Sequence, residues 1–371
     1  MNHNDLMLQA VALAEKGKGK TCPNPCVGAL VVSGSEIVGQ GYHRKFGGDH
    51  AEVEAIKDAS SRRGDLSSCI LYVTLEPCNH HGKTPPCTRA ILKSGIKEVI
   101  IGAMDPNTRV DGGGASFLKQ AGVRVRSGIQ EQKCLDLIAD FILWQQTSRT
   151  YLYLKMASTL DGRIATRQNH SKWVTAGKSR ERVHYLRSLT GAVIIGANTF
   201  YQDNPRLTCR GFDAEKQPLG IVVTSRLPDP QDDYFLLRQR PAETVFWTDQ
   251  EAEASSRAAR LKDMGCQVVP LDKKGTGLDL GQGLGWLRRE KGIYYAMCEG
   301  GGKLALGFLE AGLADELWYF MAMKILGDEQ GVPVFYGREC SFMREAIGLR
   351  LSESAMAGED LWLRLFPRDE G

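Results

Sequence analysis

Apolar residues recur at helical spacing at the start of the chain and then in short runs that are typical of buried strands. Leu6, Ala10, Leu13 and Ala14 predict a first helix that ends near Gly17. The next predicted strands are 27–32, 37–41, 70–75, 99–103 and 123–126, and the predicted helices between them are 50–59, 88–94 and 115–121. Strands that alternate with helices predict a mostly parallel sheet covered on both faces.

The alternation begins again at Tyr151, after a connecting stretch over 138–150. Predicted strands follow at 151–156, 192–196, 220–224, 244–247, 267–270, 293–299, 317–322 and 361–366. Predicted helices lie at 180–189, 251–264, 284–290 and 302–311. A chain of 371 residues is too long for one typical core. We therefore predict two α/β domains, 1–147 and 148–371, with the boundary near Ser148.

Composition narrows the possible partners. Charged residues make up 25% of the chain and the formal net charge is only +3, without the broad basic surface expected of a nucleic-acid binder. No run of about 18 apolar residues predicts a membrane span, and the polar first residues do not resemble a secretory signal. The ten cysteines are expected to be thiols, ligands or core residues. These patterns indicate a cytoplasmic protein with neither a nucleic-acid nor a membrane partner.

Three short segments indicate a catalytic metal site: His50-Ala51-Glu52, Pro77-Cys78 and Cys87. Catalytic zinc takes three protein ligands and keeps a fourth position for water, whose pKa it lowers from about 15.7 toward about 7. His50, Cys78 and Cys87 meet that requirement. Glu52 follows His50 at the start of a predicted helix, so its carboxylate can reach the water without being a ligand. General acid/base work of this kind contributes about 10²–10⁴-fold to the rate.

The spacing of the cysteines departs from the usual signature of zinc deaminases, H-x-E followed by P-C-x-x-C. His81 occupies the position of the second cysteine, and the next cysteine is Cys87. His80 and His81 are therefore alternative ligands. Two other functions also stay open: a deaminase of nucleic-acid bases, and a structural zinc module that binds a partner protein, with a closed fourth ligand position and no need for Glu52.

The run 74–87, together with His50-Ala51-Glu52 and 24–28, resembles the bifunctional deaminase/reductase family of riboflavin biosynthesis, in which eight residues separate the two cysteines. The resemblance extends through 105–107 and the second half of the chain. It implies a cytidine-deaminase-like three-layer domain followed by a dihydrofolate-reductase-like domain, and a homo-oligomer is expected for such folds. The implied reactions are zinc-dependent deamination of 2,5-diamino-6-(5-phosphoribosylamino)pyrimidin-4(3H)-one and NADPH-dependent reduction of 5-amino-6-(5-phosphoribosylamino)uracil.

The resemblance also implies the residues that bind the deaminase substrate. Asn24 and His43 are expected near the base, and Lys83, Asp105 and Asn107 are expected to hold the rest of the substrate. Asn24 can offer both a donor and an acceptor to a pyrimidine edge, and Lys83 suits a phosphate. The alternatives are a simple turn at Asn24 and a solvated loop lysine at Lys83.

In the second half, Gly300, Gly301 and Gly302 lie between a predicted strand and a predicted helix, an arrangement that can bind phosphate through main-chain N–H groups. The dinucleotide fingerprint G-x-G-x-x-G is not satisfied, because Ala305 stands at its last position. A turn without a ligand is the alternative. By resemblance, the expected NADPH contacts are Ala157, Trp173, Thr199, Asp203, Ser225, Gly301, Gly302, Lys303, Leu304, Ala305, Leu306 and Gly307.

The reductase substrate contacts implied by the resemblance are Ser171, Arg187, Leu207, Arg210 and Glu299, and Lys155 is the expected catalytic residue. Arg187 and Arg210 suit a 5'-phosphate, because a guanidinium can pair with phosphate through two hydrogen bonds. The alternatives are a solvated helix face for Arg187 and a core aromatic for Trp173. Met323 stands where such enzymes often have proline.

Overall fold

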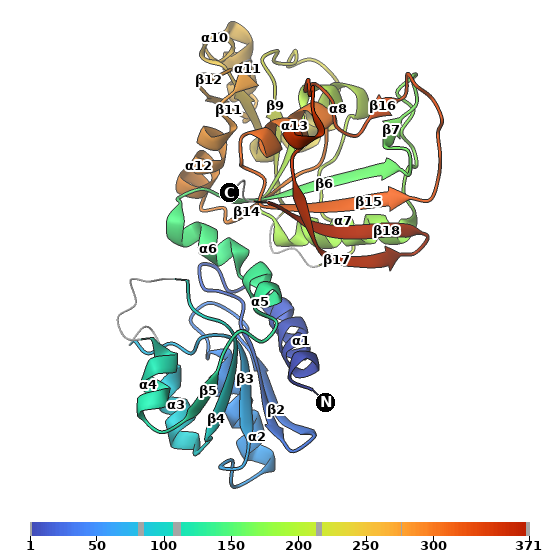
Figure 1. The fold of residues 1–371 in the computed structure, drawn as a ribbon. Coiled ribbons are helices and arrows are strands. Elements are labelled where there is room, and N and C mark those ends of the chain that lie inside the picture. The colour runs from blue at the N-terminus through green and yellow to red at the C-terminus, as the bar shows by residue number, and fades with distance from the viewer. Residues whose placement is uncertain (1, 81–84, 107–112, 213–216, 276, 369–371) are drawn as a thin grey trace. The chain divides into compact units, whose positions relative to one another are not determined.

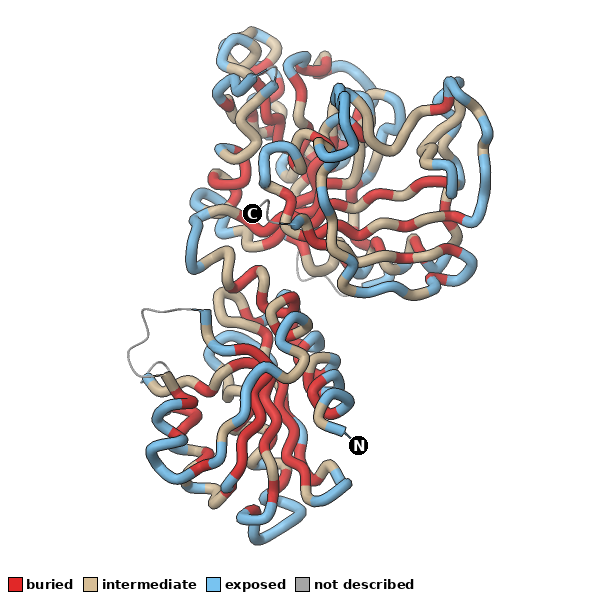
Figure 2. The backbone as a smooth tube through the Cα atoms, viewed as in Figure 1, coloured by how far each residue is buried: buried red, intermediate tan, exposed pale blue. Residues whose placement is uncertain are grey.

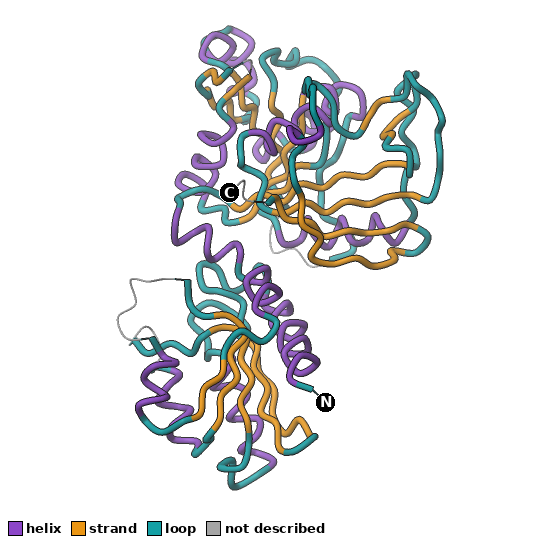
Figure 3. Tube along the Cα trace, in the orientation of Figure 1, coloured by secondary structure: helices purple, strands orange, loops and turns teal. Residues whose placement is uncertain are grey.

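The computed structural model describes residues 2–80, 85–106, 113–212, 217–275 and 277–368. The chain divides into two compact units, Met1–Thr147 and Ser148–Gly371. Both consist of a sheet with helices packed against it (Figures 1 and 3). Among the described helices, none combines the length and the apolar character that a membrane span requires.

The first unit is built on a five-stranded sheet in the order β2-β1-β3-β4-β5. Its strands are β1 (Gly28–Ser33), β2 (Glu36–Tyr42), β3 (Ile70–Leu75), β4 (Glu98–Ala103) and β5 (Arg124–Arg126). Its α-helices are α1 (His3–Ala14), α2 (Ala51–Arg62), α3 (Cys87–Ser94), α4 (Gly114–Gln120), α5 (Glu131–Leu137) and α6 (Ala139–Gln146). The pairs β3–β4 and β4–β5 are parallel, whereas β1 is antiparallel to both β2 and β3. The sheet is therefore mixed rather than mostly parallel.

The alternation of side chains along the strands produces three layers in this unit. Ala29 and Val31 of β1 pack with the buried faces of α2, α3 and α4, whereas Leu30 and Val32 pack with α1 and Cys134 of α5. Figure 2 shows the resulting buried sheet between its helices. Helix α1 covers the sheet face that carries Leu30 and Val32. Its residues buried in this core are Leu6, Met7, Ala10 and Leu13, which accounts for its amphipathic pattern.

Helix α2 lies directly on a glycine of β2. A Cβ atom at Gly41 would lie 2.4 Å from the Ala55 nitrogen and 2.5 Å from the Ala51 oxygen. We expect Gly41→Ala to push α2 outward and to lower the free energy of unfolding by about 1–3 kcal/mol, the usual cost of overpacking. Thermal unfolding checks this, with Gly64→Ala as the control, because a Cβ there meets nothing within 4 Å. Equal losses in both variants would contradict the packing argument.

The second unit contains a nine-stranded sheet in the order β11-β10-β9-β8-β14-β6-β15-β18-β17. Its strands are β6 (Tyr151–Thr159), β8 (Ala192–Gly196), β9 (Leu219–Val223), β10 (Thr244–Thr248), β11 (Gln267–Pro270), β14 (Tyr295–Cys298), β15 (Glu316–Ala322), β17 (Leu349–Ala357) and β18 (Asp360–Pro367). The run from β11 to β15 is parallel, and β18 and β17 are antiparallel additions at one edge. Short strands β7 (Arg163–Ala165) and β16 (Val332–Pro333) pair separately, as do β12 (Lys273–Lys274) and β13 (Gly277–Leu278).

The helices of the second unit are α7 (Gly177–Leu189), α8 (Ala197–Asp203), α9 (Phe235–Gln239), α10 (Gln250–Glu253), α11 (Ser256–Asp263), α12 (Leu280–Lys291) and α13 (Gly302–Glu310). The prediction of one helix over 251–264 is wrong. Asp249 caps α10 and Ser255 caps α11, each by accepting a main-chain N–H three residues on. The Ser255 cap begins a separate helix, α11, at a point where the apolar pattern alone predicts that one helix continues.

Candidate active sites

Three metal-binding atoms converge in the first unit. His50 immediately precedes α2, Cys78 follows β3, and Cys87 is the first residue of α3. The His50 Nδ1 atom lies 3.2 Å from Cys87 Sγ and 3.6 Å from Cys78 Sγ, and all three ligand atoms lie within 4.8 Å of one another. Tetrahedral bonds of about 2.0–2.3 Å separate N and S ligands by about 3.5 Å. Among the described residues these three fit zinc, which leaves one of its four coordination positions for water.

The electrostatics favour the thiolate at one of the two cysteines. The hydrogen bond with Cys87 and the neighbouring His50 lower the pKa of Cys78, whereas the same hydrogen bond and burial raise the pKa of Cys87. The main-chain N–H of Cys87, at the start of α3, also donates to the Cys78 sulfur over 3.4 Å. A thiolate is the form that binds zinc, and a helix N-terminus stabilises it.

Glu52 lies in the first turn of α2 beside the cluster and is only 3% exposed. Burial raises its pKa to about 7, and the neighbouring Cys78 adds to the effect. A carboxyl group in this environment can hold and release a proton near neutral pH, which is what a general acid/base requires. It is not one of the three converging ligand atoms.

A chain of hydrogen bonds orients the predicted base-binding residues. His43 is buried, and its Nδ1 atom lies 3.0 Å from the Asp49 carbonyl oxygen, so Nδ1 carries the proton. Nε2 is then an acceptor, and Asn24 Nδ2 lies 3.3 Å from it. The amide oxygen of Asn24 is consequently left as the acceptor for an amino group or ring N–H of a pyrimidine.

Glu76 lies two residues before the ligand Cys78 and links two main-chain positions. Its carboxylate accepts the main-chain N–H of Asp105 over 3.2 Å and that of Ala115 over 2.8 Å. Asp105 itself is half-buried. Lys83 and Asn107, predicted to contact the substrate, lie outside the described residues, as does His81. His80 is exposed and does not belong to the ligand cluster found among the described residues.

The second unit contains a cavity of about 320 Å³ near the carboxyl ends of β6, β8 and β14. Such a position is the usual ligand site of an open parallel sheet. Ten of the predicted residues line it: Lys155, Ala157, Ser171, Trp173, Arg187, Thr199, Asp203, Arg210, Glu299 and Gly301. Trp173 is 67% exposed and has the Arg180 guanidinium 4.4 Å from its ring centre, so it is not a core aromatic.

A buried charge cluster forms the floor of this cavity. Arg187 of α7 donates from Nε and Nη2 to the two carboxylate oxygens of Glu299, and from Nη1 to the Thr208 carbonyl over 2.9 Å. Burial opposes ionisation of Glu299, but Arg187 outweighs it and lowers the pKa of Glu299. Burial lowers the pKa of Lys155, and Glu299 partly offsets the shift. Arg187 is thus not on a solvated helix face.

The glycine segment forms a cradle of closely approaching main chain. Gly300 and Gly301 have φ of 150° and 82°, values that favour glycine. A Cβ at Gly302 would lie 2.4 Å from the Val334 oxygen. Gly302 also begins α13, a nine-residue helix whose first N–H groups lack partners within the helix. This cradle fits the phosphates of a dinucleotide.

The remaining predicted contacts do not line the cavity of about 320 Å³. Gly302 to Gly307 form the start of α13, and Leu207 is buried in the segment before β9. Ser225 lies in a separate hollow with Arg226, Arg257 and Arg260.

Two family models match the chain: the RibD C-terminal domain over residues 150–363, and the cytidine and deoxycytidylate deaminase zinc-binding region over residues 1–103. The riboflavin biosynthesis protein RibD of Aquifex aeolicus (strain VF5) is 40% identical over 355 residues, which cover 96% of each chain. The chain belongs to the RibD family. RibD of Actinobacillus pleuropneumoniae is 38% identical, covering 98% of this chain and 95% of its own.

Solved RibD structures show the same architecture. The crystal structure of a diaminohydroxyphosphoribosylaminopyrimidine deaminase/5-amino-6-(5-phosphoribosylamino)uracil reductase from Thermotoga maritima matches with a TM-score of 0.76 at 34% identity, covering 99% of both chains. RibD of Acinetobacter baumannii matches with a TM-score of 0.72 at 32% identity, also covering 99% of both chains. The predicted family, fold class and pair of activities are confirmed: this RibD family member is a zinc-dependent deaminase and an NADPH-dependent reductase of riboflavin biosynthesis.

Sequence reasoning missed several residues around these RibD sites, among them three ionisable ones. His184 and Arg180 line the reductase cavity, and Glu76 organises the deaminase site. His184 lies one helical turn before Arg187 on α7, so the i, i+3 spacing could have indicated it. The two long-range main-chain contacts of Glu76 leave no local pattern in the sequence.

Proposed function

We propose that the two sites act in sequence on one substrate, and that the residues named above carry the two reactions. The convergence of His50, Cys78 and Cys87 beside the buried Glu52 supports this most directly. Deamination comes first because the reductase substrate is a uracil, the product of replacing the ring amine by oxygen. Both substrates share the ribose 5'-phosphate.

In the deaminase site, His50, Cys78 and Cys87 hold the zinc, which when bound supplies a water molecule of lowered pKa. Glu52 takes the two protons of the attacking water one at a time on its carboxylate, passing the first to the ring nitrogen and the second to the amine, which leaves as ammonia. Asn24 holds the pyrimidine edge through its amide oxygen. Asp105 contributes to substrate binding, and the same role for Lys83 and Asn107 stays a prediction.

In the reductase site, bound NADPH supplies the hydride that reduces C1 of the ribosyl group. The glycine cradle holds its phosphates, and Ala157, Trp173, Thr199 and Asp203 complete the cofactor contacts in the cavity. The contact of Ser225, which lies in a separate hollow, stays a prediction. Lys155 donates a proton or positions the sugar, with Glu299 beside it. Arg210 binds the 5'-phosphate together with Ser171, whereas the contact of Leu207, which is buried and does not line the cavity, stays a prediction. Arg187 is already engaged with Glu299 and Thr208, so Arg210 is the main phosphate ligand.

Two other functions have less support. A structural zinc module needs a fourth protein ligand and no buried acid, whereas the cluster found among the described residues has three ligands with Glu52 beside it. A polynucleotide substrate favours a basic surface, and the net charge is +3.

The homo-oligomeric state and the cytoplasmic location stay predictions. Light scattering after gel filtration tests the first, and fractionation of cells that express the chain tests the second.

Purified protein given the diaminopyrimidine substrate tests the proposal as a whole. We expect ammonia release followed by NADPH oxidation. Ammonia release without NADPH oxidation would remove the reductase assignment, whereas NADPH oxidation only with added uracil substrate would remove the deaminase assignment.

Arg210→Ala tests the phosphate assignment. We expect KM for the uracil substrate to rise about 10-fold or more, because a charge-assisted contact to phosphate is lost. Ammonia release should be unchanged. Arg206→Ala is the matched control, since Arg206 is exposed, lies 5.2 Å over the Phe235 ring and does not line the cavity. A similar rise in KM in both variants would contradict the assignment.

A further inference from the structure

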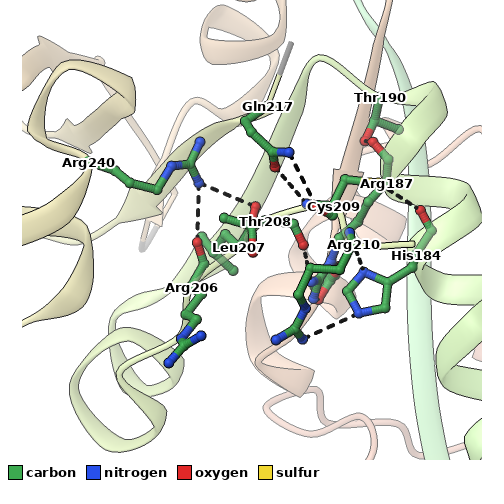
Figure 4. Close-up of polar contacts among 11 residues, drawn as sticks. His184, Arg187, Thr190, Arg206, Leu207, Thr208, Cys209, Arg210, Gln217 and Arg240 are labelled. Carbon is green, nitrogen blue, oxygen red and sulfur yellow. Dashed lines mark hydrogen bonds and ion pairs between the residues drawn. The ribbon is translucent and has the colours of Figure 1, made fainter. Parts of the chain in front are cut away.

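The segment 206–210 is held in place by side chains from distant parts of the second unit. It forms no helix or strand, yet Leu207 within it is only 2% exposed. Buried main-chain groups need hydrogen-bond partners. Figure 4 shows that side chains provide them for every residue of the segment. These partners are Arg240 for Arg206 and Leu207, Arg187 for Thr208, Gln217 for Cys209, and His184 for Arg210.

Arg240 binds two residues of the segment and one residue beyond it. It follows α9, is 8% exposed, and its guanidinium donates to the carbonyl oxygens of Arg206 at 3.2 Å, Leu207 at 3.5 Å and Pro218 at 2.7 Å. Its own carbonyl accepts from the Thr244 hydroxyl over 2.8 Å, which fixes the residue to the start of β10. Arg240 is therefore a buried cation whose hydrogen bonds are directed at main chain.

The two carbonyl groups bound by Nη1 flank the α-carbon of Leu207. Leu207 has φ of 50°, in the left-handed region that L-residues with side chains rarely adopt. Such a conformation persists only where surrounding contacts hold it. Arg240 binds the peptide groups on both sides of Leu207, so it holds the backbone dihedral angles of that residue.

Only two residues of main chain, Thr208 and Cys209, separate Leu207 from Arg210. Arg210 follows three residues later, lines the reductase cavity, and contacts His184 twice at 3.3 Å, once through its main-chain N–H and once through its guanidinium. Cys209 lies between Leu207 and Arg210 in the chain. The Gln217 side chain accepts the Cys209 N–H at 2.8 Å and donates to the Cys209 carbonyl at 3.3 Å. A rotation at Leu207 would strain these contacts of Cys209 and Arg210, on which the position of the Arg210 guanidinium depends.

We propose that Arg240 is a positioning residue for the reductase: by holding Leu207 in its left-handed conformation it places Arg210 to receive the 5'-phosphate of the uracil substrate. The inference rests on the proposed function of Arg210. Arg240 does not line the cavity. It acts on substrate binding through the main chain.

Arg240→Met and Arg240→Lys test the proposal through steady-state kinetics of the reductase. We expect Arg240→Met to raise KM for the uracil substrate about 10-fold, with kcat and KM for NADPH changed less than about 3-fold, because only substrate positioning is lost. Lysine can reach one carbonyl but not three, so Arg240→Lys should restore part of the affinity. Arg238→Met is the control, since Arg238 is exposed on α9 and contacts the Gln231 carbonyl.

The double variant Arg210→Ala/Arg240→Met separates positioning from a general role in folding. If Arg240 acts through Arg210, KM in the double variant should equal that of Arg210→Ala within about 2-fold, since coupled residues are non-additive. Gln217→Glu supplies a second test at an exposed position that should fold normally. It loses the donor to the Cys209 carbonyl and should also raise KM for the uracil substrate.

The outcomes distinguish the two proposals. An unchanged KM in Arg210→Ala overturns the phosphate assignment and this inference with it. A raised KM in Arg210→Ala beside an unchanged value in Arg240→Met overturns only the role of Arg240, whatever the value in Gln217→Glu. The role of Arg240 is also overturned if the KM increases of the two single variants multiply in the double variant. A loss of kcat and of NADPH binding in Arg240→Met that parallels the rise in KM has the same consequence.

Discussion

Replacing Glu52 by glutamine should leave zinc bound and reduce ammonia release by about 10²–10⁴-fold, the usual contribution of a general acid/base. Glutamine has nearly the shape of glutamate but cannot accept a proton from water at neutral pH. The three zinc ligands are untouched. Zinc content by atomic absorption and ammonia release by a coupled assay measure the two effects separately.

Glu54→Gln is the control for this prediction. Glu54 lies in the same first turn of α2, but its carboxylate pairs with Arg44 at 3.3 Å instead of facing the cluster. We expect normal deamination in that variant. Normal deamination in Glu52→Gln, or loss of zinc together with activity, would remove the proton-transfer role.

Cys87→Ala should lose both zinc and ammonia release, because only two of the three protein ligands remain. NADPH oxidation with added 5-amino-6-(5-phosphoribosylamino)uracil should stay within about 2-fold of the unmodified protein, since the proposed contacts of the two sites share no residue. Measuring zinc content and both half-reactions on one preparation tests this. Retained zinc in the variant would show that another residue, such as His80 or His81, completes the site.

Cys69→Ala is the matched control for Cys87→Ala. Cys69 is also a buried thiol of the first unit, but it packs in the apolar core and is not one of the clustered ligands. We expect a modest loss of stability with normal zinc content. Loss of zinc in this control would indicate that the first unit unfolds readily and that Cys87→Ala acts through folding.

The deaminase ligands could be predicted because each lies at the end of a locally encoded element. His50 precedes an amphipathic helix, Cys78 follows an apolar strand, and Cys87 begins another helix. Apolar spacing locates such ends to within a few residues. The resemblance to the RibD family supplied the identity of the second cysteine, which spacing alone left open against His80 and His81.

Some elements could not be predicted, because the apolar pattern there is weak. Strand β17 is an edge strand of mostly exposed or half-buried residues, with Leu351 and Met356 exposed, so it has no apolar run. Helices α8 and α9 have seven and five residues, too few for a helical period to be distinguished from a loop. Each is stabilised mainly by packing in the second unit.

The chemistry of this protein follows from short motifs, because a ligand or acid at the end of a helix or strand is placed by residues next to it in the chain. The shape of the reductase site depends on distant residues instead. Leu207 takes a left-handed conformation, and its carbonyl is bound by a guanidinium 33 residues later. No local propensity favours that conformation in leucine. It arises because folding brings Arg240 to main-chain groups that would otherwise be buried without partners.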